Sequence, residues 1–315
     1  MRAFYSDVFV LPLPVGHRFP MDKYRLLRQR VALELPSIAL STPCAASDGV
    51  LALAHHPQYI QSLALGTLPV AHQKAIGFPW SVEMVERSRR SAGATIDAAR
   101  AALIDGCAVN LAGGTHHAGF ETGGGFCCFN DIAVAARLMQ AERRIQFAAV
   151  IDLDVHQGNG TAQILADDPS IFTLSLHGQS NYPFRKAVSD LDVALPDGTG
   201  DSQYLEALAC ALVELRQRFT PDMIFYLAGA DVYEGDRLGK LALSKAGIAA
   251  RDQAVFDFAS SAYARPLPVA LAMGGGYCPI INDIVDVHFV TVHKALAYAN
   301  KYAELHCPKL FIPTV

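Results

Sequence analysis

The stretch VIDLDVHQGNGT, residues 150–161, places two carboxylates and an imidazole at alternate positions directly after an apolar run. Residues two apart on a strand share a face and lie about 6.6 Å apart, whereas residues four apart lie about 13 Å apart. Asp154 and His156 can therefore converge on one metal ion, and Asp152 is too far along the strand to be its third ligand. Capping and turn residues are the alternative interpretation, but ionised groups are costly to bury in a strand without partners.

A third ligand has to come from another strand end, and Asp231 in the sequence AGAD is the best candidate. Two carboxylates and one imidazole leave a coordination position open, as a catalytic zinc site requires. The same donors suit Fe²⁺ or Co²⁺, because a nitrogen and oxygen ligand set does not select one metal. The sequence therefore predicts an open metal centre formed by Asp154, His156 and Asp231.

Two adjacent histidines, His116 and His117, follow a Gly-Gly turn that allows both side chains to face one crevice. Neutral imidazole is a suitable general base near pH 7, and Asp152 can orient one of the two rings. Tyr277 follows three glycines, and its phenol can donate a hydrogen bond to an oxyanion. A purely structural histidine pair is an equally good interpretation of His116-His117 taken alone, and for the pair at 55–56 it is the preferred one.

Five apolar runs of strand length must position these side chains, at 107–112, 147–153, 171–176, 222–229 and 268–273. Segments with helical spacing lie between or beside them, at 83–104, 130–142, 161–167, 202–219, 244–263 and 284–300. Buried strands that alternate with helices predict a mostly parallel sheet covered on both faces. Since the carboxyl ends of parallel strands meet at one edge, the polar residues that end these runs are expected to share one crevice.

We therefore predict an α/β fold with a single domain, residues 1–315, in which helices cover both faces of a central sheet. Residues 1–82 contain many prolines and histidines and are expected to wrap this domain as irregular elements and short helices. Neither an internal repeat nor a linker divides the chain.

The composition restricts the class of protein. The chain has 315 residues, of which 51% are hydrophobic, and a formal net charge of −4. It contains no basic stripe typical of nucleic-acid binding and no apolar run near the ~20 residues of a membrane span. Seven cysteines without a CxxC pair indicate reduced thiols, and the N-terminus lacks the apolar core of a signal peptide. A cytoplasmic protein is expected, and the oligomeric state stays open.

Two familiar enzyme classes lack their motifs in this chain. No GxSxG sequence is present, which disfavours a serine hydrolase with a nucleophile elbow. No GxxxxGK[ST] sequence occurs, and GGGY lacks the dinucleotide-binding spacing, so nucleotide binding is not expected.

The motifs GGTHH, GFCCFND, DLDVHQGNGT, AGAD and GGGY occur in this order between residues 110 and 280. In this order they resemble those of the histone deacetylase superfamily of zinc amidohydrolases. The sequence GHRFPMDKY near the start is similar to bacterial members that are themselves similar to class IV enzymes. The resemblance implies an arginase-like α/β fold, which agrees with the alternation of strands and helices.

The resemblance also implies a role for each matching residue. Zinc would be bound by Asp154, His156 and Asp231, with His117 as general base and then general acid. His116, held by Asp152, would give electrostatic support, and Tyr277 would stabilise the oxyanion. The residues implied to bind a structural potassium ion are Asp152, Asp154, the backbone of His156, Ser175 and the backbone of Leu176. The residues implied to contact the substrate are Gly125, Phe126, Phe184, Leu238 and Gly275.

Three positions depart from the pattern of particular subfamilies. Asn159, the implied partner of His117, stands where class I members have an aspartate. Residues 66–80 contain no acid, although many peptide deacetylases use a rim aspartate there to hold the substrate backbone. Leu238 stands where polyamine deacetylases have a rim glutamate, which disfavours a cationic polyamine substrate.

The expected function is a zinc-dependent hydrolase that removes an acyl group, with acetyl as first candidate, from the side-chain amine of lysine in a protein or peptide. A deacylase of a small acylated amine is the main alternative. An arginase-type enzyme with two manganese ions is disfavoured by the single carboxylate of AGAD. A non-catalytic acyl-lysine-binding protein is disfavoured because Tyr277, both histidines and all three ligands are present.

Overall fold

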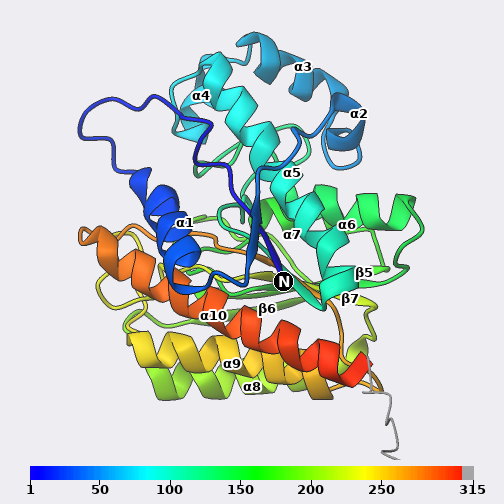
Figure 1. Ribbon diagram of the computed structural model, residues 1–315. Helices are drawn as coiled ribbons and strands as arrows, with labels where there is room; N and C mark the ends of the chain where they lie inside the picture. Colours follow the sequence, from blue (N-terminus) through cyan, green and yellow to red (C-terminus); the bar gives the residue numbers. More distant parts are fainter. Residues whose placement is uncertain (307–315) are drawn as a thin grey trace, which may run out of the picture.

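The structure is a computed structural model that describes residues 1–306 of the chain (Figure 1). The last nine residues of the predicted domain, 307–315, lie outside the described residues, and the expected reduced thiol of Cys307 lies there too. The other cysteines, six in number, are all free thiols.

One sheet of eight parallel strands forms the centre of the fold, in the order β2-β1-β3-β8-β7-β4-β5-β6. The strands are β1 (Arg2–Phe4), β2 (Ala39–Ser41), β3 (Cys107–Asn110), β4 (Ala148–Asp152), β5 (Ile171–Gly178), β6 (Leu191–Leu195), β7 (Met223–Leu227) and β8 (Val269–Ala272). The predicted α/β class and all five predicted strands are confirmed, as β3, β4, β5, β7 and β8. The short strands β1, β2 and β6 were not predicted.

The helices predicted between and after the strands are confirmed as α5 to α10. The helices are α1 (Asp22–Glu34), α2 (Asp48–Leu51), α3 (Pro57–Leu65), α4 (Val70–Ile76), α5 (Val82–Asp105), α6 (Asp131–Ala141), α7 (Asn159–Leu165), α8 (Asp201–Arg218), α9 (Lys245–Ser261) and α10 (Ile281–His306). The first 82 residues also contain two strands and the 13-residue helix α1, so the prediction of irregular elements and short helices was only partly right there. No described helix is long and apolar enough to cross a membrane.

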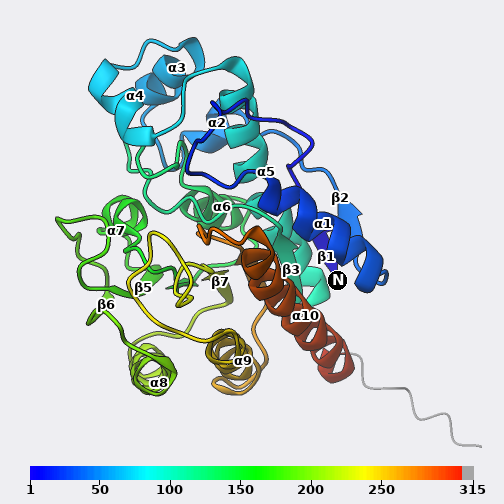
Figure 2. The same ribbon diagram turned by 90° about the vertical axis from the view of Figure 1, so that its left-hand side faces the viewer.

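Helices cover both faces of the sheet (Figures 1 and 2). Helices α5, α6 and α7 lie on one face with α2 to α4 beyond them, and α1, α8, α9 and α10 lie on the other. Strand β7 shows why both faces must be covered. Its residues Met223, Phe225 and Leu227 belong to one buried cluster, whereas Ile224 and Tyr226 belong to the other. Because side chains alternate along a strand, an apolar run without polar gaps is buried on both sides.

Two local features determine where helix α5 begins and how closely the N-terminal segment packs on it. Ser81 begins it by accepting a hydrogen bond from the Met84 amide at 3.0 Å, as an N-cap residue does. At Gly93 a Cβ atom would lie 1.8 Å from the carbonyl oxygen of Cys44. Only glycine therefore allows the N-terminal segment to lie directly on this helix.

A buried ion pair on α9 fastens the ends of the two central strands. Arg251 donates hydrogen bonds to the carbonyl oxygens of Leu153 at 3.2 Å and Gly229 at 2.6 Å, just after β4 and β7. Its Nε donates to Asp252 Oδ1 at 2.9 Å. Asp252 also accepts hydrogen bonds from the Tyr226 hydroxyl at 2.5 Å and, on its other oxygen, from the Thr291 hydroxyl at 2.6 Å. The two opposite charges thus pair inside the fold, where Arg251 Nη2 lies 2.8 Å from Asp252 Oδ1.

We predict that Arg251→Ala lowers the free energy of unfolding by about 3–5 kcal/mol, because it leaves Asp252 buried without its cation. Chemical denaturation at neutral pH measures the change. Arg216→Ala, which removes an exposed cation from α8, is the matched control and is expected to change stability by less than about 0.5 kcal/mol. A loss below about 1 kcal/mol for Arg251→Ala would show that this ion pair does not hold the strand ends.

Candidate active site

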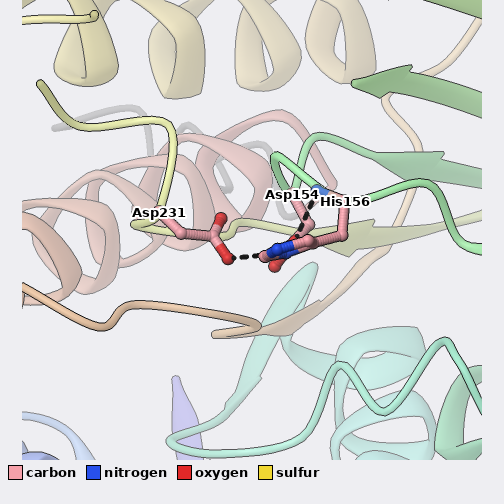
Figure 3. A group of neighbouring side chains, drawn as sticks. All are labelled: Asp154, His156 and Asp231. Atoms are coloured by element: carbon pink, nitrogen blue, oxygen red, sulfur yellow. Dashed lines mark hydrogen bonds and ion pairs between the residues drawn. The ribbon is translucent and has the colours of Figure 1, made fainter. Parts of the chain in front are cut away.

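Asp154, His156 and Asp231 converge on one point beyond the carboxyl ends of β4 and β7 (Figure 3). One ligand atom of each side chain lies within 4.8 Å of the others, and all three residues are buried. The His156 Nδ1 atom lies 3.0 Å from Asp154 Oδ1 and 3.2 Å from Asp231 Oδ2. The structure therefore brings together the three residues that were predicted to bind the metal.

The surroundings of these three residues fit a divalent cation. The outer oxygens are held by backbone amides, since Val155 donates to Asp231 Oδ1 at 3.0 Å and Gly275 donates to Asp154 Oδ2 at 2.7 Å. Asp231 Oδ2 is buried and has no hydrogen-bond partner among the described residues. Burial and the charge of Asp154 raise the pKa of Asp231 to about 7. A cation bound between the two carboxylates would favour the ionised form of both.

His116 and His117 lie side by side at the same sheet edge, with ring centroids 4.1 Å apart. His116 Nδ1 lies 2.6 Å from Asp152 Oδ2, so Asp152 supports a histidine as predicted. His117 Nδ1 lies 2.7 Å from the amide oxygen of Asn159. Because an amide oxygen only accepts, His117 Nδ1 carries the proton and its Nε2 keeps a free lone pair.

The two histidines have pKa values shifted in opposite directions. Burial lowers the pKa of His117 well below 6.5, and the nearby charges of His116 and His156 lower it further. Burial also opposes the charging of His116, but the Asp152 and Asp154 carboxylates outweigh it and raise the pKa of His116 to about 9. One ring is therefore neutral at pH 7 and the other is cationic.

A network around Asn130 and Asp131 holds the loop that carries the histidines. The Asn130 side-chain amide donates to the carbonyl oxygen of Ala118 at 3.1 Å, and Asp131 accepts from the amides of Gly114 at 3.0 Å and Thr115 at 2.8 Å. His55 Nδ1 lies 2.9 Å from the Gly119 carbonyl oxygen, and its Nε2 accepts from the Asn130 amide at 2.8 Å. His55 is thus a structural histidine, as expected, whereas the positioning role of the Asn-Asp pair was not predicted.

Tyr277 is positioned by residues that the sequence did not single out. Its backbone amide donates to Asp236 Oδ2 at 2.6 Å, while the other Asp236 oxygen accepts from the Leu238 and Gly239 amides. Lys23, only 1% exposed, donates to the Gly276 carbonyl oxygen at 3.1 Å. Asp236 and Lys23 therefore hold the turn before Tyr277 from both sides. The second aspartate of the sequence ADVYEGD was the only available signal for Asp236.

A cavity of about 590 Å³ opens in front of the catalytic group and reaches His117, His156 and Tyr277. Four of the five predicted substrate contacts line it, namely Gly125, Phe126, Phe184 and Leu238. Gly275 does not line this cavity. It lines a smaller inner pocket of about 40 Å³ that His117, His156 and Tyr277 also line. A Cβ atom at Gly275 would be 1.8 Å from Asp231 Oδ2, so glycine is needed there for close packing, and contact with a substrate stays a prediction.

The wall of this cavity includes a residue that sequence reasoning missed. Tyr182 lines the same cavity, and its ring stands edge-on to His117 with centroids 4.9 Å apart. Phe184 lies farther out, with 89% of its surface exposed. Because Tyr182 lies in the irregular loop after β5, no periodic pattern placed it near the histidines.

The residues predicted to bind potassium lie on adjacent strand ends. Asp152 in β4 pairs in register with Ser175 in β5, and Leu176 follows as a buried residue. The Asp154 amide donates to Asp152 Oδ1 at 3.1 Å, and Ser175 Oγ lies 3.0 Å from His177 Nδ1. A potassium ion at this place stays a prediction.

The structural role of His55 generates a prediction on stability. Burial lowers the pKa of His55 from 6.5 to about 4. The folded state therefore prefers the neutral ring, and the stability it contributes is complete above pH 6.5 and is lost as the pH falls towards 4. We predict that between pH 7 and pH 4 the wild type loses on the order of 3 kcal/mol more than a His55→Gln variant.

Denaturant titrations of both proteins across this pH range measure their free energies of unfolding. The contributions of the other buried histidines are the same in both proteins and cancel when the two losses are subtracted. An NMR titration of the His55 ring in the wild type is an independent readout if the variant folds poorly. A His55 pKa near 6.5 in the folded protein would contradict the prediction.

Comparison with known proteins identifies the class. A family model described as the histone deacetylase domain matches residues 17–291. The chain is 43% identical to an uncharacterized protein of Picosynechococcus sp., over 92% of this chain and 96% of that protein. It is 34% identical to histone deacetylase 2 of Arabidopsis thaliana, over 86% of this chain and 72% of that protein.

Solved structures agree on the fold. The HD domain of HDA15 superposes with a TM-score of 0.78 at 20% identity, covering 98% of this chain and 96% of that one. A histone deacetylase homologue from Aquifex aeolicus gives a TM-score of 0.79 at 22% identity, covering 96% and 87%. The fold is therefore that of the arginase and deacetylase class. The chain belongs to the histone deacetylase family, and it is a hydrolase of the deacylase type that acts on amide bonds.

Proposed function

We propose that the protein is a zinc-dependent amidohydrolase that removes an acyl group, with acetyl as first candidate, from the side-chain amine of lysine. The observation that carries the proposal is the convergence of Asp154, His156 and Asp231 within 4.8 Å at the inner end of a cavity with aromatic walls. His117 and Tyr277 line the same cavity, so a base and a hydroxyl donor flank the metal ligands. A small acylated amine is the alternative substrate.

Asp154, His156 and Asp231 would hold the metal. Zinc bound there would polarise the amide carbonyl and make a water molecule acidic enough to react at neutral pH. Fe²⁺ or Co²⁺ would suit the same donors. Two carboxylates and one imidazole are enough for a single ion, whereas an arginase-type site needs further aspartates for its two manganese ions.

His117 is the proposed general base. Its Nε2 takes a proton as the water oxygen bonds to the carbonyl carbon, and it returns a proton to the amine nitrogen as the C–N bond breaks. Asn159 keeps the Nδ1 proton in place, so the ring has the tautomer that this step needs. The products are a carboxylate and a free amine.

His116 and Tyr277 are the proposed stabilisers of the negative charge that develops on the carbonyl oxygen. His116 is cationic because Asp152 supports its Nδ1 proton, and the Tyr277 hydroxyl donates a hydrogen bond. Burial strengthens both interactions, because a fixed charge or dipole stabilises an opposite charge more in a site from which water is excluded. This complete set argues against a protein that only binds acyl-lysine.

The shape of the cavity supports an unbranched amine. Phe126 and Tyr182 line it as aromatic walls, and the left-handed turn at Gly125 (φ +52) brings the backbone close to the His117 ring. An apolar passage of this kind stabilises a chain of methylene groups and leaves the polar amide for the catalytic group. A lysine side chain has this form.

We also propose a structural potassium ion held by Asp152, Asp154, Ser175 and the backbone of His156 and Leu176. The in-register pairing of Asp152 and Ser175 supports it. The reaction is proposed to take place in the cytoplasm, which the six free cysteines favour.

The test combines metal analysis with a deacylation assay on acetyl-lysine peptides. We expect about one zinc ion per chain and release of acetate, and we expect Asp231→Asn to lose the metal because it removes a charged ligand. Zinc-loaded protein that hydrolyses no acyl-lysine across several acyl lengths would disprove the deacylase function. A metal content near two per chain would support the arginase-type alternative.

Tyr277→Phe separates the oxyanion role from metal binding. We expect a decrease in kcat of about 10²–10³-fold, because one preorganised donor is removed from the transition state. Zinc content and melting temperature should equal those of the wild type, because the phenol is not a ligand. Normal turnover by this variant would eliminate the proposed role of Tyr277.

A further inference from the structure

The mouth of the 590 Å³ cavity is cationic. Arg18, Lys74 and Lys240 all line it, and no residue among the described ones that line it carries a carboxylate. The three cations come from separate segments, namely the loop after β1, helix α4 and the loop after β7. Because the formal net charge of the chain is −4, this local excess of positive charge opposes the overall balance.

Two of the three cations are available to a ligand. Lys240 donates to Ser180 Oγ at 2.9 Å and lies 3.6 Å from Asp197, so its charge is partly offset. The Arg18 guanidinium lies 5.1 Å from the centre of the Phe126 ring, above the wall of the passage. Lys74 is exposed in the last turn of α4 and has no ion-pair partner among residues 1–306. Arg18 and Lys74 therefore set the charge at the entrance.

Asp236 lies on the same loop as Lys240 but does not line the cavity. Both oxygens of Asp236 accept backbone hydrogen bonds, one from Tyr277 and the other from Leu238 and Gly239. Leu238 itself lines the cavity without a charge. A polyamine would place a second ammonium beside these cations, which is unfavourable.

We infer that the preferred substrate carries a carboxylate next to the acylated amine, at the position that meets Arg18 and Lys74. This inference rests on the proposed deacylase function and specifies its substrate. Such a carboxylate has two sources, which share one chemistry. It is either an Asp or Glu side chain that flanks acyl-lysine in a peptide, or the α-carboxylate of a free acyl-lysine.

The expected effect is moderate and sensitive to salt. Exposed charge pairs contribute little each, and a Debye length of about 8 Å at physiological ionic strength screens them. Complementary charge at a rim acts on encounter and binding more than on the chemical step. The preference should therefore lie in KM, with kcat nearly unchanged.

The experiment compares acetyl-lysine peptides of equal length flanked by Glu, Ala or Lys, with the zinc-loaded protein at low and high salt. We expect kcat/KM to rise about fivefold from Ala to Glu flanks and to fall by a similar factor for Lys flanks at low salt. High salt should compress both differences. Free Nε-acetyl-lysine and its carboxamide form a second pair, in which a preference for the free acid identifies the α-carboxylate as the source.

Charge reversal tests the two residues directly. Lys74→Glu and Arg18→Glu should each weaken the preference for Glu flanks, and the double variant should favour Lys flanks. Lys301→Glu makes the same charge change on an exposed lysine near the end of α10, and should keep the wild-type ranking. The neighbouring Tyr302 packs against Gly106, directly before β3 and thus at the amino ends of the strands, away from the cavity. A ranking that is absent in the wild type, or unchanged in the double variant, would overturn the inference.

Failure of the proposed function is distinguishable from failure of the inference. Turnover of the Ala-flanked peptide without a preference for acid refutes only the charge inference. If no peptide is hydrolysed, binding still tests the charge inference. The peptides with Glu, Ala or Lys flanks then carry a fluorescent label, and fluorescence anisotropy measures their affinities for the zinc-loaded Tyr277→Phe protein. Tighter binding of Glu-flanked peptides supports the cationic mouth, and equal affinities refute it.

Discussion

The central physical constraint of this structure is that two carboxylates and one imidazole are buried at the same point. Asp154 and Asp231 lie close enough for one His156 nitrogen to contact both, so their charges repel unless a cation joins them. The rest of the site follows from this requirement. Backbone amides orient the outer carboxylate oxygens, and Gly275 lets the β8 loop approach where any side chain would collide with Asp231.

The strands that present these ligands are fixed from beneath by a second buried charge. Arg251 reaches the carbonyl oxygens of Leu153 and Gly229, each two residues or fewer from an aspartate that is proposed to bind the metal. The contacts of Arg251 therefore fix the distance between the starts of the loops after β4 and β7 before any ligand binds. Preorganisation of this kind is what a catalytic metal site needs, because small displacements of ligands and base cost rate.

The sequence predicted the parts of the fold and the site that depend on periodicity. The spacing of Asp154 and His156 indicated a shared ion and excluded Asp152, and the apolar runs located the five central strands. Strands β1 and β2 were missed because they have only three residues each, and β6 was missed because it alternates between partly buried and exposed positions. Contacts made by loops were missed as well. Tyr182 meets His117 through tertiary packing, which no local pattern encodes.

The paired histidines show how two partners divide one chemical task. Asp152 is a carboxylate and keeps His116 charged, whereas Asn159 is an amide and leaves His117 neutral. An aspartate at position 159 would favour the charged form of His117 and weaken it as a base at neutral pH. The amide instead fixes the tautomer without adding charge. The positive charge of His116, whose ring centroid lies 4.1 Å from that of His117, lowers the pKa of His117 further and keeps its Nε2 free to accept a proton at neutral pH.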